Sequence, residues 1–138
     1  MGRCIYGGIY DPGNRLSDEN GFRKDVIEAM RELDVPVVRY PGGNFVATYH
    51  WLDGVGPRDQ RPRRRELAWV GEESNQFGTD EFLKWCEIVG TEPYMCLNFG
   101  TGTLDEGEFR FSLSLFFSLG GIPLSPLLRK QTSERVCV

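Results

Sequence analysis

A helical pattern followed by a short apolar strand pattern occurs twice in this sequence, and this alternation most constrains its fold. In the first helical pattern apolar residues recur every three or four positions, at Phe22, Val26, Met30 and Leu33. The second pattern has the same spacing, at Phe82, Cys86 and Val89. Apolar runs at residues 35–38 and 93–97 follow the two patterns closely. We therefore expect helix, strand, helix and strand, in that order.

The connections between these elements differ in length according to their direction. Each helix leads into its strand within a few residues, whereas a long polar segment, residues 41–78, follows the first strand. Such an arrangement is typical of an α/β protein with parallel strands. The long connections leave the carboxyl ends of the strands, which is where α/β barrels build their active sites.

Local signals predict where the two helices begin and end. Asn20 is expected to cap the first helix and Thr79 to cap the second. Asp80 and Glu81 then lie against the positive end of the second helix dipole, a role that accounts for both. Gly90 is expected to end this helix.

The first strand runs into the sequence "VRYPGGNF", which places Arg39 directly before a Pro-Gly-Gly-Asn break. One interpretation is an ordinary surface turn, because Pro and Gly punctuate turns everywhere. The other is a ligand site, in which Arg39 meets the ligand and the glycines let the backbone approach it. Asn44 and Asn98 are expected at the same edge, where the two strands end. We favour the ligand site.

Composition argues against several classes of function. With 16 Lys and Arg against 20 Asp and Glu, the net charge of −4 does not favour binding to nucleic acid or to an anionic membrane. The basic cluster Arg61–Arg65 runs into Glu66 and contains no aromatic residue, so we expect a solvated loop. His50 is the single histidine, which argues against a zinc or iron site, and we expect no cofactor.

The cysteines predict a reducing compartment. Their positions, which form no Cys-x-x-Cys pair, are Cys4, Cys86, Cys96 and Cys137. The sequence is not cysteine-dense and shows no signal peptide, so we expect reduced, mostly buried thiols and a cytoplasmic location.

Five blocks between Gly2 and about Asp105 carry a resemblance to a known family. They read "GRCIYGGIYDPGN", "DENGFRKDVIEAMRELDVPVVRYPGGNF", "YHWLDGVGPRDQRP", "ELAWVGEESNQFGTDEFLKWC" and "VGTEPYMCLNFGTGT". In this order and spacing they are similar to glycoside hydrolase family 51, the α-L-arabinofuranosidases. The resemblance implies a (β/α)₈ TIM barrel, of which residues 1–105 would be a fragment with early βα units only. It also implies retaining hydrolysis of terminal α-L-arabinofuranosyl residues from arabinan and arabinoxylan, and homo-oligomers of the intact enzyme.

The resemblance also implies roles for three residues. Arg39 would brace the catalytic nucleophile and the sugar site, since its planar fork suits a carboxylate. Asn44 would contact the arabinose. Trp69 would line the mouth of the sugar pocket, because an indole face suits the C–H surface of a sugar. The alternatives are a structural ion pair for Arg39 and ordinary loop packing for Trp69.

The sequence departs from the family pattern at the catalytic residues. The family's acid/base glutamate lies in a Gly-Asn-Glu sequence, and this chain contains no Asn-Glu dipeptide. The nucleophile lies on a still later strand, and Met1 occupies the place of a further sugar-binding glutamate on the first strand. None of the nearby acidic residues is expected to replace them: Asp18, Glu19, Asp80, Glu81, Glu106 and Glu108. We therefore assign no catalytic residue and expect this chain to be inactive alone.

After Asp105 the resemblance stops, so we divide the chain into a partial barrel domain, residues 1–105, and a divergent apolar tail, residues 106–138. Residues 111–128 carry no charge, and Arg129-Lys130 follows them. A membrane anchor is one interpretation. A changed reading frame or altered splicing is the favoured one, because the tail has no clean helical or strand period and contains Gly-Gly and two prolines.

Three functional hypotheses follow. The favoured one is a fragment of a retaining arabinofuranosidase that binds an arabinofuranoside-containing saccharide only as part of the larger enzyme. The others are a non-catalytic sugar-binding remnant and a membrane-associated chain. Because parallel strands with open edges invite association, we expect the isolated chain to be partly ordered or prone to aggregate.

Overall fold

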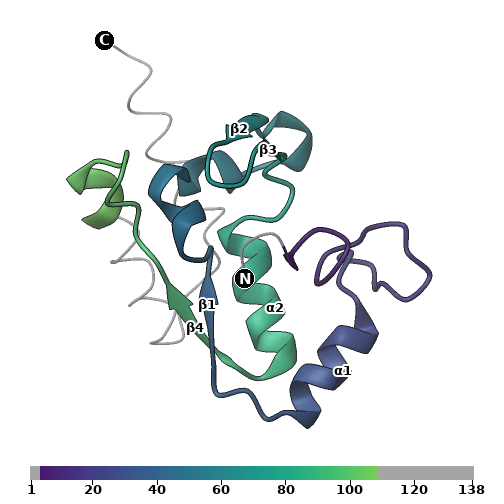
Figure 1. Ribbon diagram of the computed structural model, residues 1–138. Helices are drawn as coiled ribbons and strands as arrows, with labels where there is room; N and C mark the ends of the chain where they lie inside the picture. The colour runs from purple at the N-terminus through teal and green to yellow at the C-terminus, as the bar shows by residue number, and fades with distance from the viewer. Residues whose placement is uncertain (1–3, 109–138) are drawn as a thin grey trace.

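The computed structural model describes residues 4–108, and Figure 1 shows how their helices and strands are arranged. In chain order the helices and strands are α1 (Lys24–Glu32), β1 (Val37–Tyr40), the 3₁₀ helices η2 (Asn44–Thr48), η3 (Trp51–Gly54) and η4 (Arg58–Gln60), β2 (Arg64–Glu66), β3 (Gly71–Glu73), α2 (Thr79–Val89) and β4 (Glu92–Met95). A further helical turn begins at Leu104.

Strands β1 and β4 pair in parallel, as the helix–strand alternation predicts. Arg39 is opposite Tyr94 and Tyr40 is opposite Met95, and the ladder continues where Cys96 N–H donates to the Tyr40 carbonyl at 2.7 Å. This confirms the parallel pair, and within the described residues the sheet has these two strands alone. The expected first strand began two residues too early, because Pro36 has no N–H to donate to a ladder.

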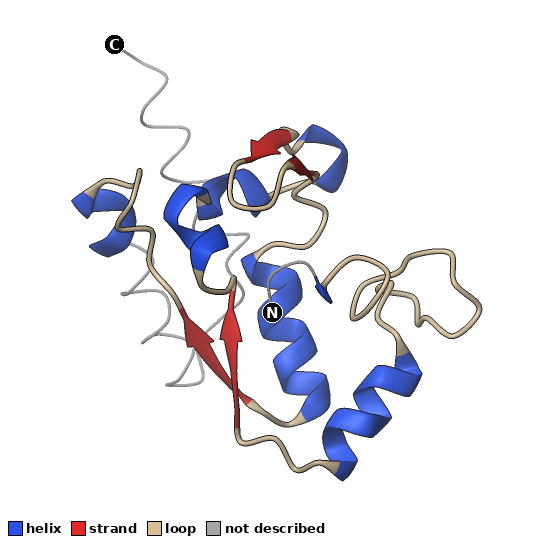
Figure 2. Cartoon of the chain, in the orientation of Figure 1, coloured by secondary structure: helices blue, strands red, loops and turns tan. Residues whose placement is uncertain are grey.

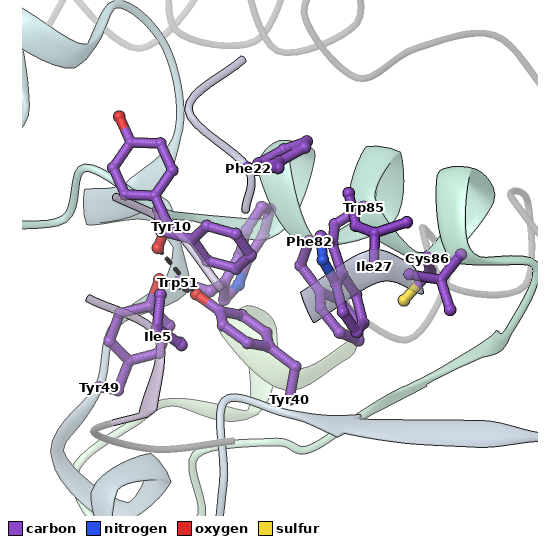
Figure 3. Packing of buried hydrophobic residues seen from close by; sticks show 12 residues of the cluster. Ile5, Tyr10, Phe22, Ile27, Tyr40, Tyr49, Trp51, Phe82, Trp85 and Cys86 are labelled. Atoms are coloured by element: carbon purple, nitrogen blue, oxygen red, sulfur yellow. Dashed lines mark hydrogen bonds between the residues drawn. The ribbon is translucent and has the colours of Figure 1, made fainter. Parts of the chain in front are cut away.

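Helix α2 covers one face of this sheet and supplies four of the twelve buried residues of the core (Figure 3). Its predicted stripe of Phe82, Cys86 and Val89 is buried, and Trp85 is buried with it. The Phe82 ring stacks on Tyr40 of β1, with 4.7 Å between ring centroids. The opposite face is open among the described residues, since Val37, Arg39 and Tyr94 on it are exposed.

The first helix differs from its predicted limits. It begins at Lys24 after Arg23 at the N-cap, with no side-chain cap, so the expected cap by Asn20 is wrong. Asn20 instead accepts a hydrogen bond from Lys84 Nζ on α2, at 2.6 Å. Phe22 is fully buried ahead of the helix, whereas Leu33 is 72% exposed after it. Val26 and Met30, in the middle of the predicted stripe, are half-buried, and the one buried residue of α1 is Ile27, which the stripe did not include.

The second helix also starts without the predicted cap. Gly78 is its N-cap and Thr79 is its first residue. The Glu81 carboxylate, three residues on, instead binds the backbone of the N-cap residue, because its Oε2 accepts from Gly78 N–H at 2.7 Å. Gly90 ends the helix as expected, with φ of +87° and its N–H on the Cys86 carbonyl at 2.8 Å.

The segment between β1 and α2 is more ordered than the long loop expected from its sequence. It contains the three 3₁₀ helices and the antiparallel hairpin of β2 and β3 (Figure 2). These elements are three to five residues long. Elements this short do not establish a detectable hydrophobic period.

Several expectations concern residues at the edge of, or beyond, the described part of the chain. Cys4, Cys86 and Cys96 are free thiols. Cys86 is buried and Cys96 is half-buried, as expected, whereas Cys4 is exposed. Cys137 lies outside the described residues. The apolar run 111–128 and most of the 106–138 tail also lie outside them. Between residues 4 and 108, no helix combines the length and apolar character needed to span a membrane.

Candidate functional site

The loops that follow β1 and β4 meet at the carboxyl edge of the sheet. Thr101 N–H donates to the Ala47 carbonyl at 3.0 Å, and the Asn98 side chain donates to the Tyr49 carbonyl at 3.2 Å. Both contacts join the segment after β4 to the segment after β1. The edge that the sequence predicts as a site is therefore one connected surface.

Asn98 organises this edge from the inside. Its side chain is buried, and its Oδ1 accepts from the N–H groups of Gly100 and Thr101 at 3.0 Å each. The sequence predicts that Asn98 lies where the strand ends, and it does. Because its amide is engaged by its own loop and by Tyr49, Asn98 holds the loop rather than facing outward.

Arg39 lies inside β1 and points away from α2. It is exposed, as are Val37 before it and Tyr94 opposite it on the partner strand. Its guanidinium lies beside the turn that follows β1. Nη2 is 3.7 Å from the position that a Cβ atom on Gly43 would occupy. Gly42 has φ of +135°, a backbone that favours glycine. The Gly-Gly pair thus forms the turn directly beside the arginine.

Asn44 is the first residue of η2 and is exposed. Two glycines separate it from Pro41, so Arg39 and Asn44 flank the same turn at the end of β1. The structure brings these two predicted site residues to one place.

Trp69 lies on a separate support, the turn between β2 and β3. The Glu66 carboxylate fixes this turn by accepting from Ala68 N–H and Trp69 N–H, both at 2.7 Å. Trp69 is 50% exposed, and the flanking Leu67 and Val70 are more exposed still. Figure 1 shows the hairpin beyond the carboxyl end of β1.

The Arg61–Arg65 cluster is not uniformly solvated. Arg63 and Arg64 are exposed and pair with Glu72 and Asp53, as a surface cluster would. Arg61 is buried, which contradicts the prediction for this residue.

Arg61 binds the amino end of α2. Its Nη2 and Nη1 donate to Glu81 Oε1 and Oε2 at 2.9 and 3.0 Å, and Nη1 also donates to the Asn75 carbonyl at 2.9 Å. Burial alone would raise the pKa of Glu81, but the hydrogen bonds from Arg61 and Gly78 outweigh it and hold that pKa below its usual value. Glu81 therefore does more than complement a helix dipole, which is all that its sequence position indicated.

The His50 ring is in hydrogen-bond contact with a carboxylate. Its Nδ1 lies 3.0 Å from Glu106 Oε2, and Trp51 Nε1 donates to the Glu106 carbonyl at 3.3 Å. Across residues 4–108, no three His, Cys, Asp or Glu side chains are grouped to hold a metal ion. Nothing in the sequence pairs His50 with Glu106, since they are 56 residues apart and belong to different loops.

Comparison with known proteins gives a consistent result. A family model described as the alpha-L-arabinofuranosidase 1 domain matches residues 29–115. The chain is 84% identical over 106 residues to a probable alpha-L-arabinofuranosidase C of Aspergillus terreus, which covers 77% of this chain and 21% of that protein. It is 59% identical over 106 residues, with the same coverage, to an intracellular exo-alpha-(1->5)-L-arabinofuranosidase of Acetivibrio thermocellus.

Solved structures give the same result for the fold. The GH51 alpha-L-arabinofuranosidase of Thermotoga petrophila superposes with a TM-score of 0.78 at 61% identity, over 81% of this chain and 23% of that chain. An arabinose complex of the Thermotoga maritima enzyme superposes with a TM-score of 0.75 at 64% identity, over 77% of this chain and 22% of that chain. The chain thus spans about a fifth of the length of the relatives it matches. Because the family model matches more than half of the sequence, the chain belongs to glycoside hydrolase family 51, the α-L-arabinofuranosidases.

Proposed function

We propose that this chain supplies early βα units of a (β/α)₈ barrel in a retaining α-L-arabinofuranosidase. The substrate class is terminal non-reducing α-L-arabinofuranosyl residues of arabinan- and arabinoxylan-type saccharides. The observation that carries the proposal is the parallel pairing of β1 and β4, which gathers the loops at one edge of the sheet in a chain so similar to named arabinofuranosidases. Barrel enzymes build their sites at this edge.

Three residues are proposed to bind the sugar. The Arg39 guanidinium offers a fork of donors that suits a carboxylate, so it orients the nucleophile of the complete site. The Asn44 amide both donates to and accepts from sugar hydroxyls. The Trp69 ring presents an apolar face to the C–H side of arabinose. Their exposure in the structure supports a role toward a ligand.

The chemistry proposed for the complete site needs two carboxylates. Retention uses a nucleophile and an acid/base about 5 Å apart, and passes through a glycosyl-enzyme intermediate. No residue of this chain is assigned either role, since its sequence has no Gly-Asn-Glu. We propose that residues of this chain bind and orient the sugar, while the carboxylates belong to the part of the family enzymes beyond the matched segment.

The open face of the sheet supports the barrel. Val37, Arg39 and Tyr94 share this face and are exposed, whereas the other face packs against α2. In a (β/α)₈ barrel each strand turns one face to the helices and one to the interior. We propose that the open face is the interior one. We further propose a cytoplasmic homo-oligomer; the location is supported by the Acetivibrio thermocellus relative, which is described as intracellular.

A chimera tests this function directly. The 106 matched residues of the Aspergillus terreus relative are replaced with those of this chain, and hydrolysis of 4-nitrophenyl α-L-arabinofuranoside is measured. We expect activity within about tenfold of the parent enzyme, because volume-conserving core changes are well tolerated. A folded chimera without activity would contradict the proposal. Chain 1–138 alone, assayed in parallel, is expected to give no hydrolysis.

A further inference from the structure

The side-chain amide of Asn75 donates one hydrogen bond, but its oxygen, Oδ1, accepts none from the described residues. Asn75 is 1% exposed. Its backbone N–H donates to Glu73 Oε1 at 2.7 Å, its carbonyl accepts from Arg61, and its Nδ2 donates to the Pro62 carbonyl at 2.6 Å. Its Oδ1 is buried and receives no hydrogen bond from any residue that the structure describes.

The orientation of this amide is fixed by its neighbour. The Pro62 carbonyl only accepts hydrogen bonds, so the NH₂ group of Asn75 must face it. Rotating the amide would place two acceptors against each other. Oδ1 is therefore a true acceptor on the other side, and a buried acceptor without a donor costs free energy.

A small cavity lies beside Asn75, between the η2–η3 segment and the β2–β3 hairpin. It has a volume of about 20 Å³ for a water-sized occupant. Its polar lining comes from Thr48, His50 and Asp53 on one side and from Arg64, Arg65, Glu66, Glu73 and Asn75 on the other. A single water needs roughly 10–15 Å³ measured in this way, together with two to four polar partners. The cavity meets both requirements.

We propose that this cavity binds one water molecule, which donates a hydrogen bond to Asn75 Oδ1 and so links the β2–β3 hairpin to the η2–η3 segment. Thr48 and the carboxylates of Glu66 and Glu73 offer its remaining partners. Arg64 and Arg65 also line the cavity, and their positive charge opposes the entry of a cation into the same space. A neutral donor therefore fits the cavity better than a cation.

This water adds an interior link between two segments that a surface ion pair also joins. Arg64 of β2 donates to Asp53 of η3 at 2.8 and 3.1 Å, but the Arg64 side chain is 61% exposed. Exposed ion pairs hold their partners weakly. Because the hairpin carries Trp69, the water positions the support of that ring; this consequence rests on the proposed function, whereas the water itself does not.

Water-17O magnetic relaxation dispersion on the full chain tests the proposal, since it counts long-lived buried waters without any sugar. Thr48→Ile places added carbon in the cavity and is expected to remove one long-lived water from the count. Val46→Ile adds bulk on the same 3₁₀ helix away from the cavity lining and is expected to leave the count unchanged. An unchanged count in Thr48→Ile would overturn the proposal.

A second measurement needs no variant. A high-resolution crystal structure of the unmodified chain is expected to show one water within hydrogen-bond distance of Asn75 Oδ1. A dry cavity, a metal ion there, or a side chain donating directly to Oδ1 would each overturn the proposal, and none of these results would bear on whether the family activity is retained.

Discussion

Arg61 and Glu81 form a buried, two-fold hydrogen-bonded ion pair that ties the segment before the β2–β3 hairpin to the first turn of α2. The two residues are 20 positions apart. Their side chains are 3% and 9% exposed, so the pair is shielded from solvent. The position of α2, which covers the β1–β4 sheet, therefore depends on a contact that the basic cluster does not reveal in the sequence.

Breaking this pair is expected to destabilise the chain strongly. Arg61→Ala leaves the Glu81 carboxylate buried without the two hydrogen bonds and the positive charge that offset its burial. Removing one partner of a buried pair costs roughly 3–5 kcal/mol. Urea unfolding followed by circular dichroism measures the loss. Arg63→Ala is the matched control in the same cluster, and its exposed pair with Glu72 is expected to contribute little to stability. Equal losses in the two variants would contradict the burial of Arg61.

The same pair predicts a dependence of stability on pH. The pKa of Glu81 is lowered in the folded state, so its contribution is present above its ordinary value of 4.5 and is lost as the pH falls through the lower folded value. Asp80 and Glu73 have raised pKa values and act in the opposite direction. We therefore compare the native chain with Glu81→Gln.

The difference between these two chains isolates Glu81. Their free energies of unfolding are expected to differ most between pH 5 and 7 and to converge as the pH falls below 4.5. Urea titrations at several pH values measure this difference. A gap that widens on acidification would show that the pair with Arg61 does not stabilise the carboxylate.

Much of the fold was predictable because it rests on periodic apolar patterns. The α2 stripe and the glycine that ends it were identified correctly, and so was the parallel pair. The caps were not, because Gly78 caps α2 with help from a carboxylate three residues on, and Asn20 contacts α2 instead of its own helix. The hairpin was missed because its strands are too short to show a period.

The candidate site was predictable in part. The sequence placed Arg39 and Asn44 beside one turn, and the structure confirms that proximity. It gave no sign that Arg61 is buried or that His50 pairs with Glu106, because each contact joins residues brought together by the fold. Their binding roles, like that of Trp69, remain predictions.

The three tryptophans provide a test of whether the chain folds on its own. Trp51 and Trp85 are at most 1% exposed, whereas Trp69 is 50% exposed. Acrylamide is therefore expected to quench one fraction of the emission readily, and Trp69→Phe is expected to remove that fraction. If all the emission is equally quenched in the native chain, the isolated chain does not form this core.

The turn that carries Trp69 contains a strained residue. Val70 has φ of +57°, which costs a β-branched side chain roughly 1–2 kcal/mol, and at 83% exposure it gains little from packing. Val70→Gly is expected to stabilise the chain by up to about 1 kcal/mol, because glycine's own entropic cost of roughly 0.5–1 kcal/mol offsets part of the relief. Val55→Gly, at φ of −113°, is the control and should destabilise it.

The role proposed for Arg39 is best tested in the chimera with the Aspergillus terreus relative. Loss of one preorganised donor at a reacting centre costs about 10²–10³ in rate. Arg39→Ala is therefore expected to lower kcat/KM by at least about 100-fold. Thermal unfolding of the same variant is measured beside it, and the loss of activity is expected to exceed any loss of folded chimera. Arg39→Lys keeps the charge but loses the planar fork, and it should recover only part of the activity.

Arg15→Ala removes an exposed arginine from a loop before α1 and is expected to leave kcat/KM unchanged. If Arg39→Ala instead lost stability and activity in proportion, Arg39 would be a structural residue, and the binding role would pass to Asn44 and Trp69.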